Sequence, residues 1–362
     1  MNAVFEPYLN LIEKEILSAL PQEPGPQWRT ECFGPLDKAV VPGHLSPLIA
    51  PTRELVLAGG KRWRPLLLVL CAEAFMQEQG ISGERQKELM ESAYHLTPLV
   101  ELVHTASLIH DDIEDRATTR RNFPAAYISH GLDTALNAGS WLYFAAPMCI
   151  ESLCATQEMK NALLMAYTLE TRRLHLGQAM DIAWHRNAEI FPDVQEYLAM
   201  VKSKTGTLSS LAARTGLLIA GADADKAQRA AECARGIGAG FQIIDDVTNI
   251  TSGNKGKDRG DDIVEGKKSL PVLLYAGRCG AGPLKELQEY FKAASSEGIG
   301  SPAVESAIKI LNESGAVEEA KEYGLKMTGS CCRELNDILG DTEACGKINT
   351  LFKEMFPAEV IK

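Results

Sequence analysis

Residues 99–115 read LVELVHTASLIHDDIED, a long apolar run that closes on a pair of aspartates. The pattern recurs at residues 240–249, GFQIIDDVTN. Positions i and i+4 of a helix share a face, so Asp111 lies beside Asp115, and the second copy repeats this spacing. Clustered carboxylates repel one another unless a cation lies between them. Mg²⁺ prefers oxygen ligands and usually completes its shell with phosphate oxygens. Two facing clusters therefore predict a magnesium site for a diphosphate.

Composition excludes several other classes of protein. The 362 residues are 45% hydrophobic, which is enough for a large core, and the net charge of −11 argues against nucleic acid as a partner. The nine cysteines show no recurring spacing, which favours reduced thiols in a cytoplasmic protein. The N-terminus lacks the pattern of a signal peptide, and no apolar run is long enough for an integral membrane segment.

Apolar residues recur with helical periodicity along most of the chain, and almost no segment alternates like a strand. We therefore expect an all-α protein without a sheet, folded as one domain over 1–362 because the two aspartate motifs need each other. The Pro- and Gly-rich segment 21–50 is expected to be irregular. The polar, glycine-rich segment 251–267 is expected to be a mobile loop suited to act as a lid. The expected helices are 3–20, 65–79, 84–112, 133–152, 158–186, 193–222, 226–250, 268–279, 283–297, 302–314, 316–338 and 342–355.

Basic residues accompany the acidic motifs. Residues 59–65, GGKRWRP, combine glycines, cations and the start of a helix, which together bind anions. Arg120-Arg121 follows the first acidic motif, residues 204–207 (KTGT) fall at a helix break, and Lys267 ends the charged loop. This arrangement predicts two anion sites, one bridged by metal and one held by cations alone.

Together these motifs resemble the trans-isoprenyl diphosphate synthases of the polyprenyl synthetase family, over residues 59 to about 271. The resemblance implies an all-helical bundle around a deep central cavity, usually as a homodimer. It also implies a Mg²⁺-dependent reaction that joins isopentenyl diphosphate head to tail to an allylic diphosphate. The allylic diphosphate ionises, the double bond of isopentenyl diphosphate attacks the cation, and the released diphosphate takes up the proton.

The resemblance also assigns residues to these tasks. The metal ligands would be Asp111, Asp112, Asp115, Asp245 and Asp246. The allylic diphosphate would contact Arg120, Lys204, Gln242, Lys257 and Lys267, and isopentenyl diphosphate would contact Lys61, Arg64, His104 and Arg121. Gln178 and Asp181 match a pair that lines the allylic pocket. The catalytic group would comprise Asp111, Asp112, Lys204, Thr205 and Gln242, with Thr205 shielding the cation.

Two residues depart from the family pattern. Asn249 stands where many members have a third aspartate. The asparagine side chain keeps an oxygen for a metal contact but lacks the negative charge of aspartate. Asn122 replaces a common glycine after the arginine pair, and little effect is expected.

The resemblance further predicts product length. In the family, bulky residues four or five places before the first motif stop chain growth, and here those places hold Ser107 and Ala106. Val103 lies one turn further on. These small residues predict a product of twenty carbons or more, unless Trp141 or Phe144 closes the pocket from another helix.

Two other functions compete with this one. A class I terpene cyclase also uses an aspartate-rich motif and Mg²⁺, but its second motif requires Ser or Thr at the place of Asn249 and Glu at the place of Gly253. Cyclases also do not need the second anion site. A non-catalytic subunit of a heteromeric synthase would tend to lose motif residues, which this chain keeps.

Overall fold

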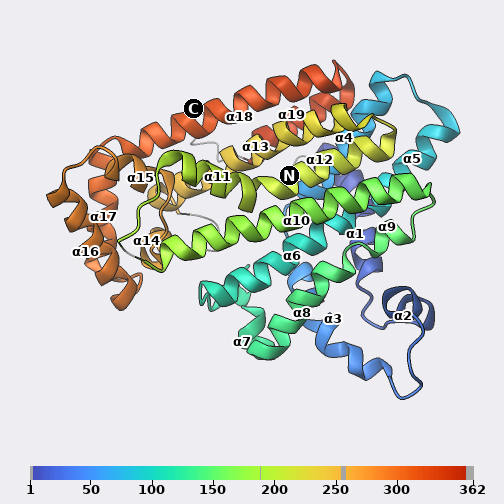
Figure 1. The fold of residues 1–362 in the computed structure, drawn as a ribbon, viewed down its shortest axis with the longest axis horizontal. Coiled ribbons are helices and arrows are strands. Elements are labelled where there is room, and N and C mark those ends of the chain that lie inside the picture. The colour runs from blue at the N-terminus through green and yellow to red at the C-terminus, as the bar shows by residue number, and fades with distance from the viewer. Residues whose placement is uncertain (1–2, 188, 254–257, 356–362) are drawn as a thin grey trace. The chain divides into compact units, whose positions relative to one another are not determined.

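The computed structural model describes residues 3–187, 189–253 and 258–355. Helices account for nearly all of its regular structure, as Figure 1 shows, so the prediction of an all-α protein is confirmed. The expectation of no sheet is wrong at one place, where β1 (Thr119–Arg120) pairs antiparallel with β2 (Phe123–Pro124). The two residues between these strands, Arg121 and Asn122, both have positive φ, which is typical of a type I′ hairpin turn.

The chain divides into two compact units. Of the described residues, the first unit comprises those from Ala3 to Leu169 together with 211–231 and 336–354, and the second comprises those within 170–210 and 232–335 together with Met355. The division falls inside α10 (Gln157–His185), α12 (Gly206–Ala220), α13 (Ala224–Thr251) and α18 (Ala316–Leu339). The prediction of a single domain stays a prediction.

In the first unit, α6 (Thr97–Glu114) is the central helix, and it packs against α8, α3, α4 and α1. Leucines 66 to 68 of α4 are all fully buried, as expected for a helix that is apolar on every side. Besides α6 and parts of the helices that the division cuts, this unit contains η1 (Ala3–Phe5), α1 (Glu6–Ala19), α2 (Pro26–Phe33), η2 (Pro42–Leu45), α3 (Ser46–Leu57), α4 (Trp63–Glu78), α5 (Gly83–His95), α7 (Ala126–His130), α8 (Leu132–Ala145), α9 (Met148–Glu151) and nearly all of α19 (Glu343–Met355).

The second unit has its own hydrophobic core around the C-terminal half of α13. Tyr197, Ile243, Leu273, Phe291 and Leu311 meet in this core, each at most 3% exposed. They come from α11 (Val194–Lys204), α13, α15 (Leu270–Ala276), α16 (Ala281–Glu297) and α17 (Pro302–Glu313). The core therefore supports the helix that carries the second aspartate pair.

The prediction of an irregular segment at 21–50 is wrong in part, because α2, η2 and the start of α3 lie inside it. Each of these elements has a proline in its first turn: Pro26, Pro42 and Pro47. Proline at the start of a helix loses no hydrogen bond and already has a helical φ, so here it begins helices instead of breaking them.

Other differences lie at breaks within expected helices. The segment 84–112 divides at Leu96 into α5 and α6, with Pro98 in the first turn of α6, and 133–152 divides before Pro147. The charged segment 251–267 contains a short helix, α14 (Asp261–Glu265). In the described part of the chain, no helix combines the length and the apolar character that a membrane span requires. None of the nine cysteines, all of which the structure describes, forms a disulfide.

Candidate active site: two charged clusters

The first aspartate motif lies at the C-terminal end of α6. Asp111 and Asp115 are half-buried, whereas Asp112 is 1% exposed. The Nε atom of Arg120 donates a hydrogen bond to Asp112 Oδ1 at 2.7 Å, and its second amino group lies 3.6 Å from Asp111 Oδ2. Arg120 therefore neutralises Asp112 and leaves the accessible face of the helix to Asp111 and Asp115.

The β1–β2 hairpin sets the position of the two arginines. Its turn requires positive φ at Arg121 (55°) and Asn122 (67°), and Asn adopts this conformation more readily than most residues. Asn122 can therefore stand where glycine is common. The Arg121 guanidinium donates to the backbone oxygens of Leu55 (3.0 Å) and Gly59.

Gly59 and Gly60 shape the basic cluster before α4. Gly59 has a φ of 93°, and a Cβ on Gly60 would lie 2.9 Å from the Arg62 guanidinium and 3.1 Å from that of Arg121. The buried Arg62 donates to Glu101 Oε1 at 2.7 Å and to the backbone oxygen of Val56 at 2.6 Å. The glycines therefore leave space for a layer of arginines around one buried carboxylate.

Arg64 and His104 complete this cluster. The Arg64 guanidinium lies 4.4 Å from the Trp63 ring, and burial lowers the pKa of Arg64 to about 10. Burial, together with the charges of Arg64 and Arg121, holds the pKa of His104 well below its ordinary value. The cluster thus presents fixed cations beside a neutral imidazole, and Lys61 is exposed at its edge.

The His104 pKa predicts how stability depends on pH. The folded protein resists protonation of His104, whereas the unfolded chain protonates it near pH 6.5, so this group removes stability as pH falls below 6.5. Below pH 6.5, the loss in the free energy of unfolding that His104 causes approaches about 1.4 kcal/mol per pH unit. The free energy of unfolding of His104→Gln, measured by urea denaturation from pH 7.5 to 5.5, should fall less steeply than that of the wild type. Parallel curves would contradict a His104 that stays neutral in the folded protein.

The second unit carries the KTGT break, as predicted: α11 ends at Lys204 and α12 begins at Gly206. Glycines allow close helix contacts around it. A Cβ on Gly177 of α10 would lie 2.3 Å from the backbone nitrogen of Lys204, and one on Gly206 would lie 2.5 Å from the backbone oxygen of Arg235 in α13. A Cβ on Gly238 would lie 2.9 Å from Gly206 Cα. Only glycine fits at these positions without a backbone shift.

Lys204 and Asp181 form an ion pair, with 2.6 Å between Lys204 Nζ and Asp181 Oδ2. Burial alone would raise the pKa of Asp181, but Lys204 and the nearby His185 side chain hold that pKa below its usual range. The predicted residue of the allylic pocket and the predicted diphosphate ligand are therefore in direct contact. Gln178, one turn before Asp181, is half-buried.

A chain of hydrogen bonds joins the break to the second aspartate motif. Thr205 Oγ1 donates to Gln242 Oε1 at 2.9 Å, and Gln242 Nε2 donates to Asp246 Oδ1 at 2.9 Å. The buried Tyr197 hydroxyl donates to Asp246 Oδ2 at 2.7 Å. Both oxygens of Asp246 thus accept protein hydrogen bonds, whereas the neighbouring Asp245 is half-buried and more accessible.

Asn249 holds the charged segment. Its side chain is fully buried; its Oδ1 accepts from the backbone nitrogen of Asp262 at 3.3 Å, and its backbone oxygen accepts from Gly260 at 3.1 Å. Lys267 follows α14 and pairs with Glu265 and, at 3.6 Å, with Asp262. Lys257 lies outside the described residues.

A match to a family model decides which class of protein this is. The polyprenyl synthetase model matches residues 46–309, which include both aspartate motifs and both basic clusters. The chain belongs to the polyprenyl synthetase family. The prediction made from its motifs is confirmed, and so is the prediction of a trans-prenyltransferase of isoprenoid biosynthesis.

Relatives of this polyprenyl synthetase support the same assignment. It is 31% identical to a geranylgeranyl diphosphate synthase of Sulfolobus acidocaldarius over 86% of this chain and 90% of that protein. It is 33% identical to one of Methanosarcina mazei over 81% of this chain and 84% of that protein. A solved geranylgeranyl pyrophosphate synthetase of Pyrococcus horikoshii superposes with a TM-score of 0.78 at 26% identity, covering 98% of this chain and 97% of that one.

The predicted chain-length residues of this polyprenyl synthetase differ in accessibility. Ala106 and Val103 are 0% exposed, whereas Ser107 is half-buried on the helix face that also carries His104 and Asp111. Ser107 therefore has the most accessible side chain of these three predicted positions. The Trp141 ring stacks on Phe33, with 6.3 Å between the ring centroids.

The suggestion that Phe144 closes the pocket is wrong for the single chain, because its side chain is 82% exposed. Sequence reasoning also left several buried partners unassigned, namely Arg62, Glu101, Glu170, Tyr197 and Arg235. Helical spacing could have pointed to two of them. Arg235 lies about two turns before Gln242, and Glu170 lies about two turns before Gln178, so each shares a helix face with a predicted site residue.

Proposed function

We propose that this polyprenyl synthetase extends an allylic diphosphate with isopentenyl diphosphate, using Mg²⁺, to a product of twenty carbons or more. One observation carries the proposal: the accessible face of α6 has carboxylates at its end and the small Ser107 one turn below. A carboxylate face above an open position fits a diphosphate head with a long apolar tail. The names of the two archaeal relatives, both geranylgeranyl diphosphate synthases, support this length.

The donor set fits Mg²⁺. Asp111 and Asp115 offer oxygens on one helix face, and Asp245 offers another in the second motif. Among residues 3–187, 189–253 and 258–355, no three acidic, histidine or cysteine side chains form a ready-made metal site. Mg²⁺ usually binds through one or two carboxylates together with water and substrate phosphates. Asp112 and Asp246 would then serve by orienting the others, because Arg120 occupies one oxygen of Asp112, and Gln242 and Tyr197 occupy both oxygens of Asp246.

The residues divide the chemistry between two diphosphates. Bound Mg²⁺ would stabilise the negative charge that grows on the leaving diphosphate. We assign Arg120, Lys204, Gln242 and Lys267 to that allylic diphosphate, and Lys61, Arg64, His104 and Arg121 to isopentenyl diphosphate. A neutral His104 can donate a hydrogen bond without adding a charge, and the arginines supply fixed cations. Thr205 Oγ1, fixed by Gln242, is placed to orient the allylic group.

Product analysis tests this function. Purified protein with Mg²⁺, isopentenyl diphosphate and allylic primers of five, ten and fifteen carbons should yield products of at least twenty carbons by mass spectrometry. Ser107→Phe should shorten the main product, because a ring there fills the accessible position. Ala106→Phe, at a site with no exposed surface, should cost about 1–3 kcal/mol of stability by overpacking, whatever it does to product length.

A wild-type product of fifteen carbons would contradict the proposed length, and absence of any condensation product would contradict the function. An unchanged product distribution in a folded Ser107→Phe variant would remove Ser107 from the pocket.

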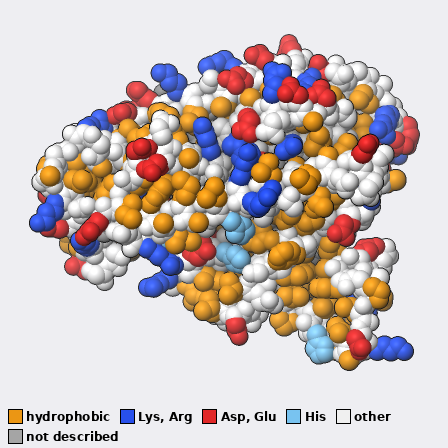
Figure 2. All heavy atoms as spheres, viewed as in Figure 1, with side chains coloured by type: hydrophobic (Ala, Val, Ile, Leu, Met, Phe, Trp, Pro, Cys, Tyr) orange, Lys and Arg blue, Asp and Glu red, His pale blue; other side chains and the backbone are white. Residues whose placement is uncertain are grey.

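We also propose a homodimer that uses the exposed face of α8. Leu132, Leu136 and Phe144 lie at multiples of four residues along this helix and are 54%, 48% and 82% exposed. Figure 2 shows hydrophobic side chains gathered over α7 and α8. Isolated exposed hydrophobic residues are ordinary, but an aligned stripe of large ones favours a partner surface, and a second copy fits the usual state of the family.

The dimer predicts a change in mass. Phe144→Glu should convert a dimer into a monomer in light scattering coupled to gel filtration, because a charge would be buried in place of the most exposed side chain of the stripe. Leu11→Glu, at a 46% exposed leucine of α1, is the matched control and should leave the mass unchanged. A wild-type monomer, or a dimeric Phe144→Glu variant, would contradict this use of α8.

A further inference from the structure

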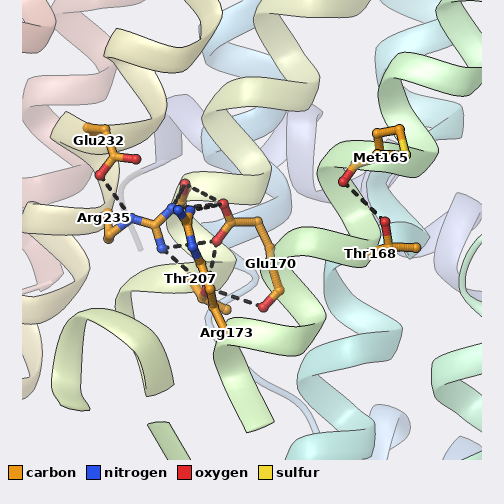
Figure 3. Close-up of polar contacts among 8 residues, drawn as sticks. Met165, Thr168, Glu170, Arg173, Thr207, Glu232 and Arg235 are labelled. Carbon is orange, nitrogen blue, oxygen red and sulfur yellow. Dashed lines mark hydrogen bonds and ion pairs between the residues drawn. The ribbon is translucent and has the colours of Figure 1, made fainter. Parts of the chain in front are cut away.

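A buried ion pair lies two helical turns from the predicted allylic ligands. Glu170 of α10 is 1% exposed and Arg235 of α13 is 6% exposed. The two terminal nitrogens of Arg235 donate to the two carboxylate oxygens of Glu170, at 3.0 and 2.7 Å, in a bidentate pair (Figure 3). No role in the reaction described so far requires these two residues.

The pair holds the first turn of α12 as well as joining two helices. Thr207 Oγ1 donates to Glu170 Oε2 at 2.6 Å, and Arg235 donates to Ser210 Oγ at 2.9 Å. Thr207 and Ser210 are themselves fully buried. The remaining nitrogen of Arg235 donates to Glu232 at 3.1 Å, and Arg173 donates to Glu170 at 3.0 Å. Three helices are therefore tied at one point, as Figure 3 shows.

That point lies immediately after the KTGT break. Thr207 follows Lys204 by three residues, and the backbone of Arg235 lies against Gly206, where a Cβ would approach to 2.5 Å. Lys204 in turn reaches Asp181 on α10, and Thr205 reaches Gln242 on α13. Helices α10 and α13 thus contact the α11–α12 break on both sides: at the start of α12 through the buried pair, and at the end of α11 through Lys204 and Thr205.

A stabilising role alone does not account for this network well. Replacing a buried ion pair with hydrophobic residues of similar volume is often neutral or stabilising, so such pairs are weak stabilisers overall. Their hydrogen bonds, in contrast, allow only one arrangement of the groups that they join. Here both Glu170 oxygens and all three Arg235 nitrogens are used.

We infer that Glu170 and Arg235 are positioning residues for the allylic diphosphate: they fix the α11–α12 break and hence the placement of Lys204 and Thr205. This inference rests on the proposed assignment of Lys204 and Thr205 to the allylic substrate. A misplacement of about 1 Å can cost on the order of 100-fold in rate. Loss of the pair should therefore weaken the use of the allylic diphosphate and leave the use of isopentenyl diphosphate unchanged.

The chain offers a matched control. Glu101, 2% exposed, pairs with the buried Arg62 beside the basic cluster assigned to isopentenyl diphosphate. Glu170→Gln and Glu101→Gln make the same chemical change in two buried Arg–Glu pairs of this protein. If each pair positions its own cluster, the two variants should have opposite effects on the two substrates.

The experiment measures KM for each substrate, with the other saturating. Glu170→Gln should raise the allylic KM about 10-fold or more and change the isopentenyl KM less than about twofold, and Glu101→Gln should do the reverse. The single variant leaves a buried charge without its partner and could fail to fold. The Glu170→Leu/Arg235→Met double variant removes both charges and keeps a similar volume, so it tests the same contact in a protein that should fold. It should unfold at a temperature close to that of the wild type and show the same allylic defect.

Wild-type kinetics in a stable double variant, or equal changes in both KM values for Glu170→Gln, would overturn the inference. A wild-type enzyme that makes no condensation product would instead overturn the proposed function. In that case calorimetry with an unreactive allylic thiolodiphosphate would still test the pair, because it measures the affinity of the allylic cluster for its ligand without turnover. Unchanged affinity in the double variant would then overturn the inference separately.

Discussion

Alanine at Asp111 or Asp245 is expected to reduce turnover by at least about 1,000-fold while the protein stays folded, because each would remove a proposed ligand of the metal that stabilises the leaving diphosphate. Both carboxylates are half-buried and belong to crowded acidic clusters. The charge of Asp245 adds to the burial and to the Asp262 charge that raise the pKa of Asp246, so its removal relieves repulsion. Without metal, the free energy of unfolding should therefore hold or rise.

Asp112→Ala provides the contrast within the same motif. Asp112 is buried and bonded to Arg120, so its loss leaves that guanidinium without its main partner and should cost about 3–5 kcal/mol of stability. Turnover with varied Mg²⁺ and urea denaturation without metal measure the two effects separately. Asp341→Ala, at an exposed acid, should change neither. Near-wild-type turnover in Asp111→Ala or Asp245→Ala would refute the ligand assignment.

The features that the sequence predicted are local ones. Helical periodicity identified the helices that carry the two aspartate motifs, and the KTGT motif was expected at a helix break, where α11 ends and α12 begins. The spacing of Asp111 and Asp115 needed only helix geometry. Prolines were harder to interpret, because the same residue breaks a helix in its interior and begins one in its first turn, as Pro26 does in α2.

The buried pairs could not be predicted, because each depends on segments far apart in the chain. Glu170 and Arg235 are 65 residues apart, and Arg62 and Glu101 are 39 apart. A lone charged residue on a helix is usually exposed, so composition and periodicity both assign it to the surface. The burial of Asn249 is similar: its position in the motif suggested a metal contact, whereas the structure turns its oxygen to the backbone of Asp262.

Gly177→Ala is expected to damage both stability and catalysis, although alanine is the better helix former by about 1 kcal/mol. A Cβ at this position would lie 2.3 Å from the backbone nitrogen of Lys204 and 2.8 Å from its Cα. Backbone atoms cannot rotate away as a side chain can, so α10 and α11 must separate. We expect a loss of about 1–3 kcal/mol from overpacking and a fall in kcat/KM for the allylic substrate, because Lys204 moves with the backbone.

Gly346→Ala is the matched control for this prediction. Gly346 lies within α19, and a Cβ there would meet no atom within 4 Å, so alanine should stabilise the protein by up to about 1 kcal/mol and leave kinetics unchanged. Thermal denaturation of both variants measures the change in stability, and steady-state assays measure the change in kcat/KM for the allylic substrate. Because the two changes are chemically identical, opposite signs of the stability change would show that the contact at Lys204, and not helix propensity, requires glycine at 177. A Gly177→Ala enzyme as stable and active as the wild type would mean that α10 and α11 can separate without disturbing the allylic cluster.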